Sequence, residues 1–132
     1  MRPIFHLSFP VADLDDAIAF YIASFGAIPG RREESWAEIA LFGAQVTLQS
    51  APGDVTDPMP SSRHFGATLT WPDWEAATGR IQDFVEAPRI DYVGCRHEQA
   101  KAMVRDPSGN LIELKAYRNL ATVLHCLAGA DS

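Results

Sequence analysis

The sequence contains few cysteines, no long apolar segment and no cluster of basic residues. Its two cysteines, Cys95 and Cys126, are too few for a disulfide framework and lack the paired spacing of metal ligands, so we expect reduced thiols. No uninterrupted apolar run approaches the roughly 20 residues that a membrane-spanning helix needs. A net charge of −6 disfavours contact with a phosphate backbone. We therefore expect no membrane partner and no nucleic-acid partner.

The N-terminal residues also lack the features of a secretory signal. Residues 1–6 contain neither a long apolar stretch nor a small-residue cleavage site, so a cytoplasmic location is the default expectation. The chain has 132 residues, of which 47% are hydrophobic and 21% charged. These values are ordinary for a soluble globular protein, and the length predicts one domain over residues 1–132.

The first half of the sequence predicts a strand, a helix and three further strands. The helix over residues 14–25 has apolar residues at helical spacing, Asp13 as its N-cap and Gly26 as its C-cap. Gly43 marks a tight turn before the last strand of this half. The predicted strands cover residues 4–11, 31–35, 36–42 and 45–49.

The second half repeats this order after a loop over residues 50–62, which is rich in proline and serine. Pro72 and Asp73 open a helix whose apolar face runs to Val85, so the segment Asp73-Trp74-Glu75 stands 60 positions after Asp13-Leu14-Asp15. The predicted strands cover residues 63–71, 89–94, 101–105 and 110–117, and a short helix is expected over 120–127. We interpret this as a structural repeat: module one spans about 1–52, module two about 62–118, and the tail 119–132.

Four of these strands alternate between an apolar side and a polar side. The polar sides could simply face water, as antiparallel sheets allow. However, His6, His64 and Glu113 all fall on polar sides. If the sheets curve into a cup with these sides inward, two imidazoles and one carboxylate converge there. Such a set suits a divalent transition metal and leaves positions open for water or substrate.

Three motifs resemble the vicinal oxygen chelate superfamily, which includes glyoxalases, bleomycin-resistance proteins, fosfomycin-resistance enzymes and extradiol dioxygenases. They are the segment from Phe5 to Leu14, the segment His64-Phe65-Gly66, and the turn Asp106-Pro107-Ser108-Gly109-Asn110 leading to Glu113. The resemblance covers residues 4–117. It implies an α+β fold of two βαβββ modules whose mixed sheet curves around a central cup.

The resemblance also implies the positions of the metal ligands, on the first strand of each module and the last strand of the second. These positions hold His6, His64 and Glu113. The divalent ion is Fe(II), Mn(II), Ni(II) or Zn(II). Glyoxalase I enzymes usually add a Glu where this sequence has Thr47, so lactoylglutathione lyase activity is disfavoured. Candidates to line the cup are Gln45, Thr47, Thr68 and Trp36, and Tyr117 is the candidate catalytic residue.

The sequence thus predicts a metal-dependent enzyme that chelates two adjacent oxygens of a small substrate, with dioxygenase-like or lyase/isomerase-like chemistry. The alternative is a metal-independent protein of the bleomycin-resistance type that binds and sequesters a small molecule. Lys115 is equally compatible with a place inside or outside the cup. A homodimer is expected because superfamily members commonly dimerise.

Overall fold

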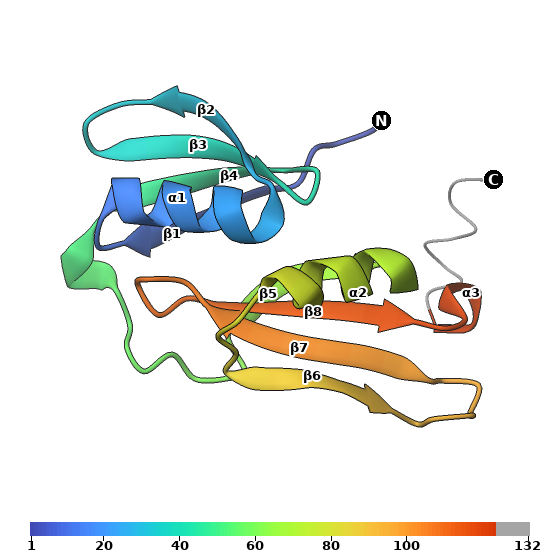
Figure 1. Cartoon of the computed structure of the whole chain (residues 1–132). Coiled ribbons are helices and arrows are strands. Elements are labelled where there is room, and N and C mark those ends of the chain that lie inside the picture. Colours follow the sequence, from blue (N-terminus) through green and yellow to red (C-terminus); the bar gives the residue numbers. More distant parts are fainter. Residues whose placement is uncertain (124–132) are drawn as a thin grey trace. The chain divides into compact units, whose positions relative to one another are not determined.

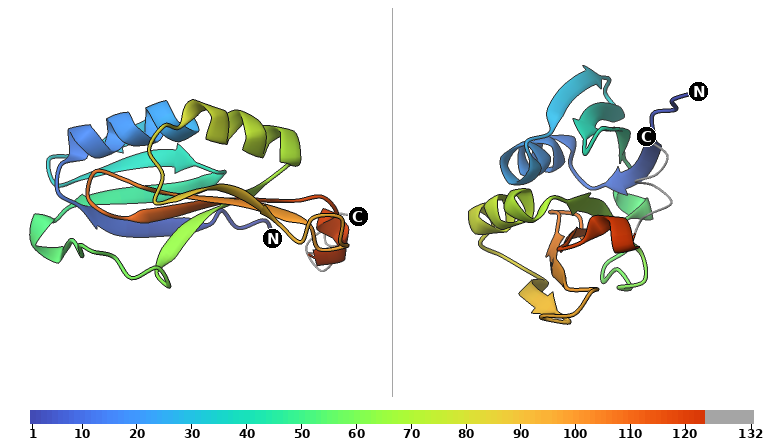
Figure 2. Two further views of the ribbon diagram at one scale, coloured as in Figure 1. Left: turned by 60° about the horizontal axis from the view of Figure 1, so that its bottom comes forward. Right: turned by 90° about the vertical axis from the view of Figure 1, so that its right-hand side faces the viewer.

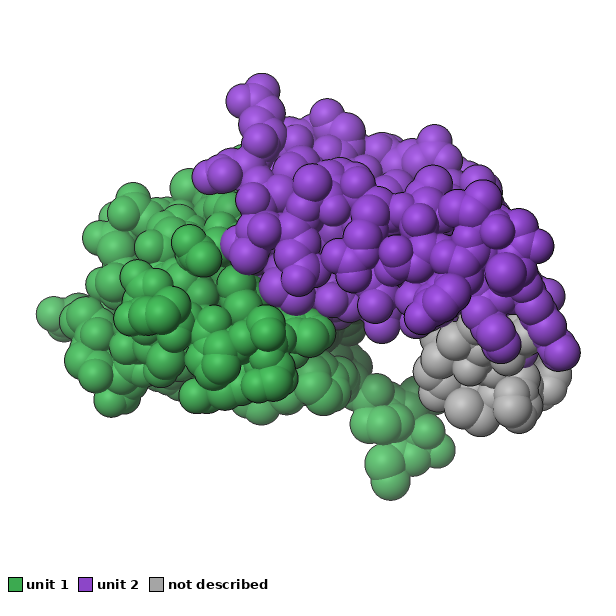
Figure 3. Space-filling model, turned by 90° about the horizontal axis from the view of Figure 1, so that it is seen from below, with its two compact units in different colours: residues 1–64, 105–111 green, residues 65–104, 112–132 purple. Residues whose placement is uncertain are grey.

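The computed structural model describes residues 1–123 of the chain. The chain divides into two compact units, coloured separately in Figure 3. Unit 1 comprises Met1–His64 and Arg105–Leu111, and unit 2 comprises Phe65–Val104 and the chain from Ile112 onward. Among the described residues, no helix is long and apolar enough to cross a membrane.

Unit 1 contains a four-stranded mixed sheet in the order β1-β4-β3-β2, with the helix α1 on one face (Figure 1). Strands β1 and β4 are parallel, and the other neighbours are antiparallel. A 3-10 turn, η1, follows β4. The bounds are β1 His6–Val11, α1 Leu14–Phe25, β2 Ile28–Arg32, β3 Trp36–Leu41, β4 Ala44–Ser50 and η1 Pro52–Asp54.

Helix α1 forms as the sequence predicts. The Asp13 side chain accepts a hydrogen bond from the backbone N–H of Asp16, which satisfies one of the donors left free at a helix N-terminus. Gly26 ends the helix in the left-handed conformation with φ of 68°, which favours glycine. Leu14, Ala17 and Tyr21 form its buried side. The predicted boundaries and both caps are confirmed.

Unit 2 contains a second four-stranded sheet, in the order β5-β8-β7-β6, with α2 along one face (Figure 2). Its chain order of strand, helix and three strands matches that of unit 1. Two mixed sheets with two helices constitute an α+β fold of two βαβββ modules, as predicted. The bounds are β5 His64–Leu69, α2 Trp71–Arg80, β6 Glu86–Asp91, β7 Gln99–Arg105 and β8 Leu111–Tyr117, followed by the short α3, Leu120–Val123.

Three elements have boundaries that differ from the prediction. Strand β2 runs from Ile28 to Arg32 and not over the predicted residues 31–35, so Pro29 and Gly30 lie within it. Helix α2 begins at Trp71 and ends at Arg80, which leaves Val85 outside the helix and partly exposed. Strand β6 begins at Glu86 and ends at Asp91, three residues earlier than predicted at each end. The part of the predicted terminal helix beyond residue 123 lies outside the described residues.

The repeat is also capped differently from the sequence prediction. The N-cap of α2 is Thr70, whose hydroxyl accepts a hydrogen bond from the backbone N–H of Asp73 at 3.3 Å. Asp73 therefore lies inside the first turn of α2, whereas Asp13 precedes α1. The two acidic segments that we aligned do not occupy equivalent helical positions.

Candidate functional site

The first sheet has one face covered by α1 and one polar face. Alternation along β3 and β4 buries the apolar residues on the helix side. The opposite face carries the polar side chains, because residues two apart on a strand share a side. This polar face is formed by His6, Ser8, Trp36, Glu38, Gln45, Thr47 and Gln49.

His6 is the first residue of β1 and lies in register with Gln45 of β4. Its Nδ1 atom is 3.1 Å from the backbone carbonyl oxygen of Gln45. A carbonyl oxygen can only accept, so Nδ1 carries a hydrogen, and in a neutral ring this leaves the lone pair on Nε2. His6 is therefore held in the tautomer that binds a metal through Nε2.

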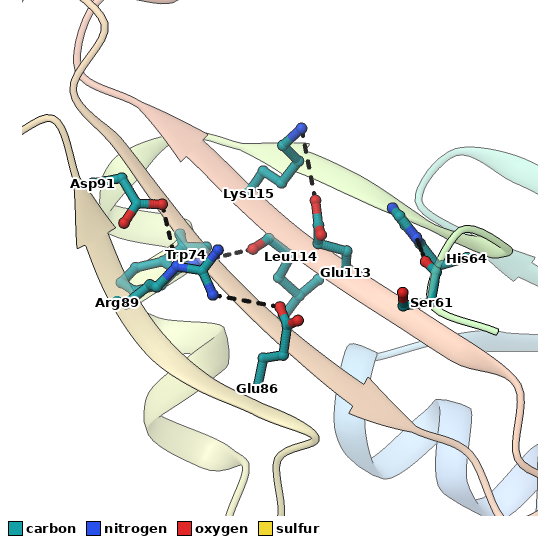
Figure 4. Close-up of polar contacts among 9 residues, drawn as sticks. All are labelled: Ser61, His64, Trp74, Glu86, Arg89, Asp91, Glu113, Leu114 and Lys115. Atoms are coloured by element: carbon teal, nitrogen blue, oxygen red, sulfur yellow. Dashed lines mark hydrogen bonds and ion pairs between the residues drawn. The ribbon is translucent and has the colours of Figure 1, made fainter. Parts of the chain in front are cut away.

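His64 has the same arrangement in a different local setting. It is the first residue of β5, and its Nδ1 lies 2.6 Å from the carbonyl oxygen of Ser61, drawn in Figure 4. This contact again places a hydrogen on Nδ1, and in a neutral ring this leaves the lone pair on Nε2. Strand β5 neighbours β8, the strand that carries Glu113.

Glu113 lies near the middle of β8 with its side chain 12% exposed. Its backbone comes so close to Gly66 of β5 that a Cβ atom built on this glycine would lie 1.8 Å from the Glu113 carbonyl oxygen. Only glycine permits that approach. Gly66 thus positions the backbone of the candidate carboxylate ligand, a role that the sequence reasoning did not assign.

The predicted lining residues of unit 2 lie on β5 and β8. Thr68 is exposed on β5, two positions beyond Gly66. Tyr117 is half-buried at the end of β8. Lys115 shares its side of β8 with Glu113 and Tyr117, and its ammonium lies 5.8 Å from the Tyr117 ring centroid.

One predicted lining residue of unit 1, Gln45, belongs to a hydrogen-bonded row that runs across three strands through Glu38 and Arg31. Glu38 accepts from Arg31 of β2, with Nε 3.0 Å from Oε2, and from the Gln45 amide at 3.2 Å. Chiefly through the Arg31 hydrogen bonds, the pKa of Glu38 is lowered, so this carboxylate is ionised. The Arg31 guanidinium also lies 5.5 Å from the ring centroid of Trp36, and Thr47 is in register with Glu38.

Sequence reasoning missed Arg31 and Glu38. The alternation of Trp36, Glu38 and Ala40 with buried residues was a usable signal for the position of Glu38. Arg31 could not be read in the same way, because the register of β2 against β3 shifts between Pro29 and Arg32 and alternation alone does not show such a shift.

No group of three or more His, Cys, Asp or Glu side chains is gathered as a metal site within residues 1–123. His6 and His64 belong to unit 1 and Glu113 to unit 2. Their convergence therefore stays a prediction.

Comparisons with known proteins agree with the fold. The model of the Glyoxalase/Bleomycin resistance protein/Dioxygenase superfamily matches residues 4–114. A protein of that description from Alicyclobacillus acidocaldarius has 30% sequence identity and a TM-score of 0.74, covering 89% of this chain and 92% of its own. The chain belongs to this superfamily. The resemblance predicted from the sequence is confirmed.

More distant members of the superfamily share the fold alone. The fosfomycin resistance protein FosX from Listeria monocytogenes has 17% identity and a TM-score of 0.69, with 88% of this chain and 93% of its own covered. A superfamily domain from Frankia sp. EAN1pec has 18% identity and the same TM-score, with 90% and 94% covered. No curated protein sequence matches the chain.

The donor types present in this superfamily member fit a divalent transition metal. Each histidine has Nδ1 hydrogen-bonded to a carbonyl oxygen, which is the usual second contact of a metal-binding imidazole. Two imidazoles and one carboxylate are donor types that a divalent transition metal binds in proteins. Members of the superfamily commonly use divalent metals.

Proposed function

We propose that the chain is a metal-dependent enzyme whose divalent ion is held by Nε2 of His6, Nε2 of His64 and the carboxylate of Glu113. The observation that carries the proposal is the shared setting of the two imidazoles. Each begins the first strand of its module, and each has Nδ1 bound to a backbone carbonyl oxygen. Such a contact to Nδ1 is the usual second contact of an imidazole that binds a metal through Nε2, and its presence at both positions supports the proposal.

In this proposal the polar faces line the substrate cup. The bound ion supplies Lewis-acid stabilisation of two neighbouring substrate oxygens. Gln45, Thr47, Thr68 and Trp36 bind and orient the substrate through amide, hydroxyl and ring contacts. Tyr117 is proposed to hold a proton at its phenolic oxygen and would be the catalytic residue. The chemistry is dioxygenase-like or lyase/isomerase-like, and the cytoplasmic homodimer is part of the same proposal.

Elemental analysis tests the metal site directly. Protein purified without a metal-affinity tag should contain about one divalent ion per chain. His6→Ala and Glu113→Ala should each lower metal affinity by roughly tenfold or more, because either change removes a ligand. His97→Ala is the matched control, since His97 lies in the loop between β6 and β7.

The outcome also separates the enzyme from a sequestration protein. Metal-free protein that still binds an aromatic or peptide drug would contradict the proposal and favour sequestration. Equal metal content in the wild type and both ligand variants would contradict the assigned ligands. Oxygen uptake with a panel of catechols, measured on Fe(II)-loaded protein, then tests the dioxygenase branch.

A further inference from the structure

The proposed ligand Glu113 has a lysine beside it on the same side of the same strand. Lys115 Nζ lies 3.6 Å from Glu113 Oε1, and Figure 4 shows both side chains rising from β8 toward one another. The Lys115 side chain is 33% exposed and the Glu113 side chain 12%, so both are largely shielded from solvent. The sequence left the side of Lys115 open, and the structure places it with Glu113.

Arg89 of β6 is a second cation whose charge interacts with that of Glu113. It is, however, paired with Asp91 at 3.2 Å and with Glu86 at 3.5 Å. Lys115 has the Tyr117 ring as its second contact, which is attractive for a cation but carries no net charge.

Metal binding changes this balance. When Glu113 binds a divalent cation, its negative charge is shared with that cation, and the Lys115 ammonium then lies beside net positive charge. An anionic oxygen supplied by the substrate relieves this repulsion, and the ammonium has three donors to offer it. A neutral substrate leaves the repulsion in place.

We propose that Lys115 binds an anionic oxygen of the substrate. The substrate is then an oxyanion, either a carboxylate or a phosphonate, that chelates the ion through neighbouring oxygens. This inference rests on the proposed function. It specifies that the substrate is negatively charged and that Lys115 determines this specificity. Lys115 binds the substrate and not the metal.

Isothermal titration of the metal-loaded protein tests this inference without an activity assay. The probes are oxalate for the carboxylate class and methylphosphonate for the phosphonate class, titrated at matched ionic strength. The test variant is Lys115→Met, which keeps the length of the side chain and removes its charge. The control variant is Lys101→Met, at the only other lysine of the chain.

Lys115→Met should weaken binding of the recognised anion by about tenfold, since a charge-assisted hydrogen bond is lost. Its affinity for the metal alone should stay equal or increase, because a repulsive charge is gone. Lys101→Met should match the wild type in both titrations. A stronger effect with oxalate or with methylphosphonate identifies the class.

Two results overturn the inference in distinguishable ways. If the metal binds normally and both lysine variants bind both anions as the wild type does, Lys115 is not an anion-binding residue and the metal site stands. If the wild type binds no metal, the proposed function fails and the inference fails with it.

Discussion

At the scale of single residues, Gly66 has no room for a side chain because the Glu113 backbone lies against it. A methyl group at Gly66 would meet the Glu113 carbonyl carbon at 2.7 Å as well as its oxygen. Gly66→Ala must therefore push β5 and β8 apart, and overpacking of this kind costs about 1–3 kcal/mol or more. We expect the unfolding free energy in urea to fall by that amount.

The same substitution elsewhere provides the control for Gly66. Gly79 lies near the end of α2, where an added Cβ has nothing within 4 Å. Gly79→Ala should stabilise the protein by about 0.5–1 kcal/mol, because alanine is the better helix residue. Equal effects of the two substitutions would show that the close approach at Gly66 is not a constraint.

A second residue-scale prediction concerns the buried phenol of Tyr21. Its hydroxyl donates to Asp106 Oδ2 at 2.8 Å, and burial, with help from the Asp106 charge, raises its pKa above the ordinary value of 10.0. The native state thus holds this proton more tightly than the unfolded chain does. The resulting stability is complete below about pH 10 and is lost as the pH rises above it.

Tyr21→Phe should therefore change the pH dependence as well as the stability. We expect a loss of about 1 kcal/mol near neutral pH from the missing hydrogen bond, and a shallower decline above about pH 10. Urea unfolding between pH 7 and pH 11 measures both. Tyr92→Phe, at an exposed side chain, should keep the wild-type slope. An unchanged slope in Tyr21→Phe would contradict the prediction.

At the scale of elements, the sequence predicts best where its local signals agree. Helix α1 has periodicity, a capping aspartate and a terminal glycine at consistent positions, and its boundaries are correct. Helix α2 has an apolar face that continues beyond its end, and Thr70 competes with Asp73 as a cap. Strand β2 contains Pro29 and Gly30, which local rules assign to a turn, and pairing with β3 overrides that preference.

In the candidate site, too, the sequence predicted the features that depend on one strand and missed those that depend on a neighbouring segment. Strand alternation was sufficient to place His6 and Glu113 on polar faces. It could not show that each histidine bonds a carbonyl oxygen through Nδ1, because Gln45 and Ser61 supply these oxygens from the backbone. It also could not show the approach at Gly66, which depends on the neighbouring strand.

At the scale of the whole molecule, the turn between β7 and β8 belongs to unit 1 although both flanking strands lie in unit 2. Asp106 is 2% exposed and is the centre of this turn. Its Oδ1 accepts from the backbone N–H groups of Ser108 and Asn110, at 2.8 and 2.9 Å. The Ser108 hydroxyl accepts from the N–H of Ala12 at 2.8 Å, so the turn is bonded to the β1–α1 junction.

Because this turn is continuous with β7 and β8, loss of unit 1 should release an end of both strands, and the two units should unfold together. Asp106→Ala should lower the unfolding free energy by about 3 kcal/mol, since it leaves buried N–H donors without an acceptor. Trp36 reports on unit 1, and Trp71 and Trp74 report on unit 2. One variant should keep only Trp36, and another only Trp71 and Trp74, so that fluorescence follows each unit by itself. The two urea unfolding transitions should coincide, and Asp106→Ala should shift both by the same amount. Asp83→Ala, at an exposed position, is the control and should shift neither. A shift confined to the Trp36 signal would show that the units unfold independently.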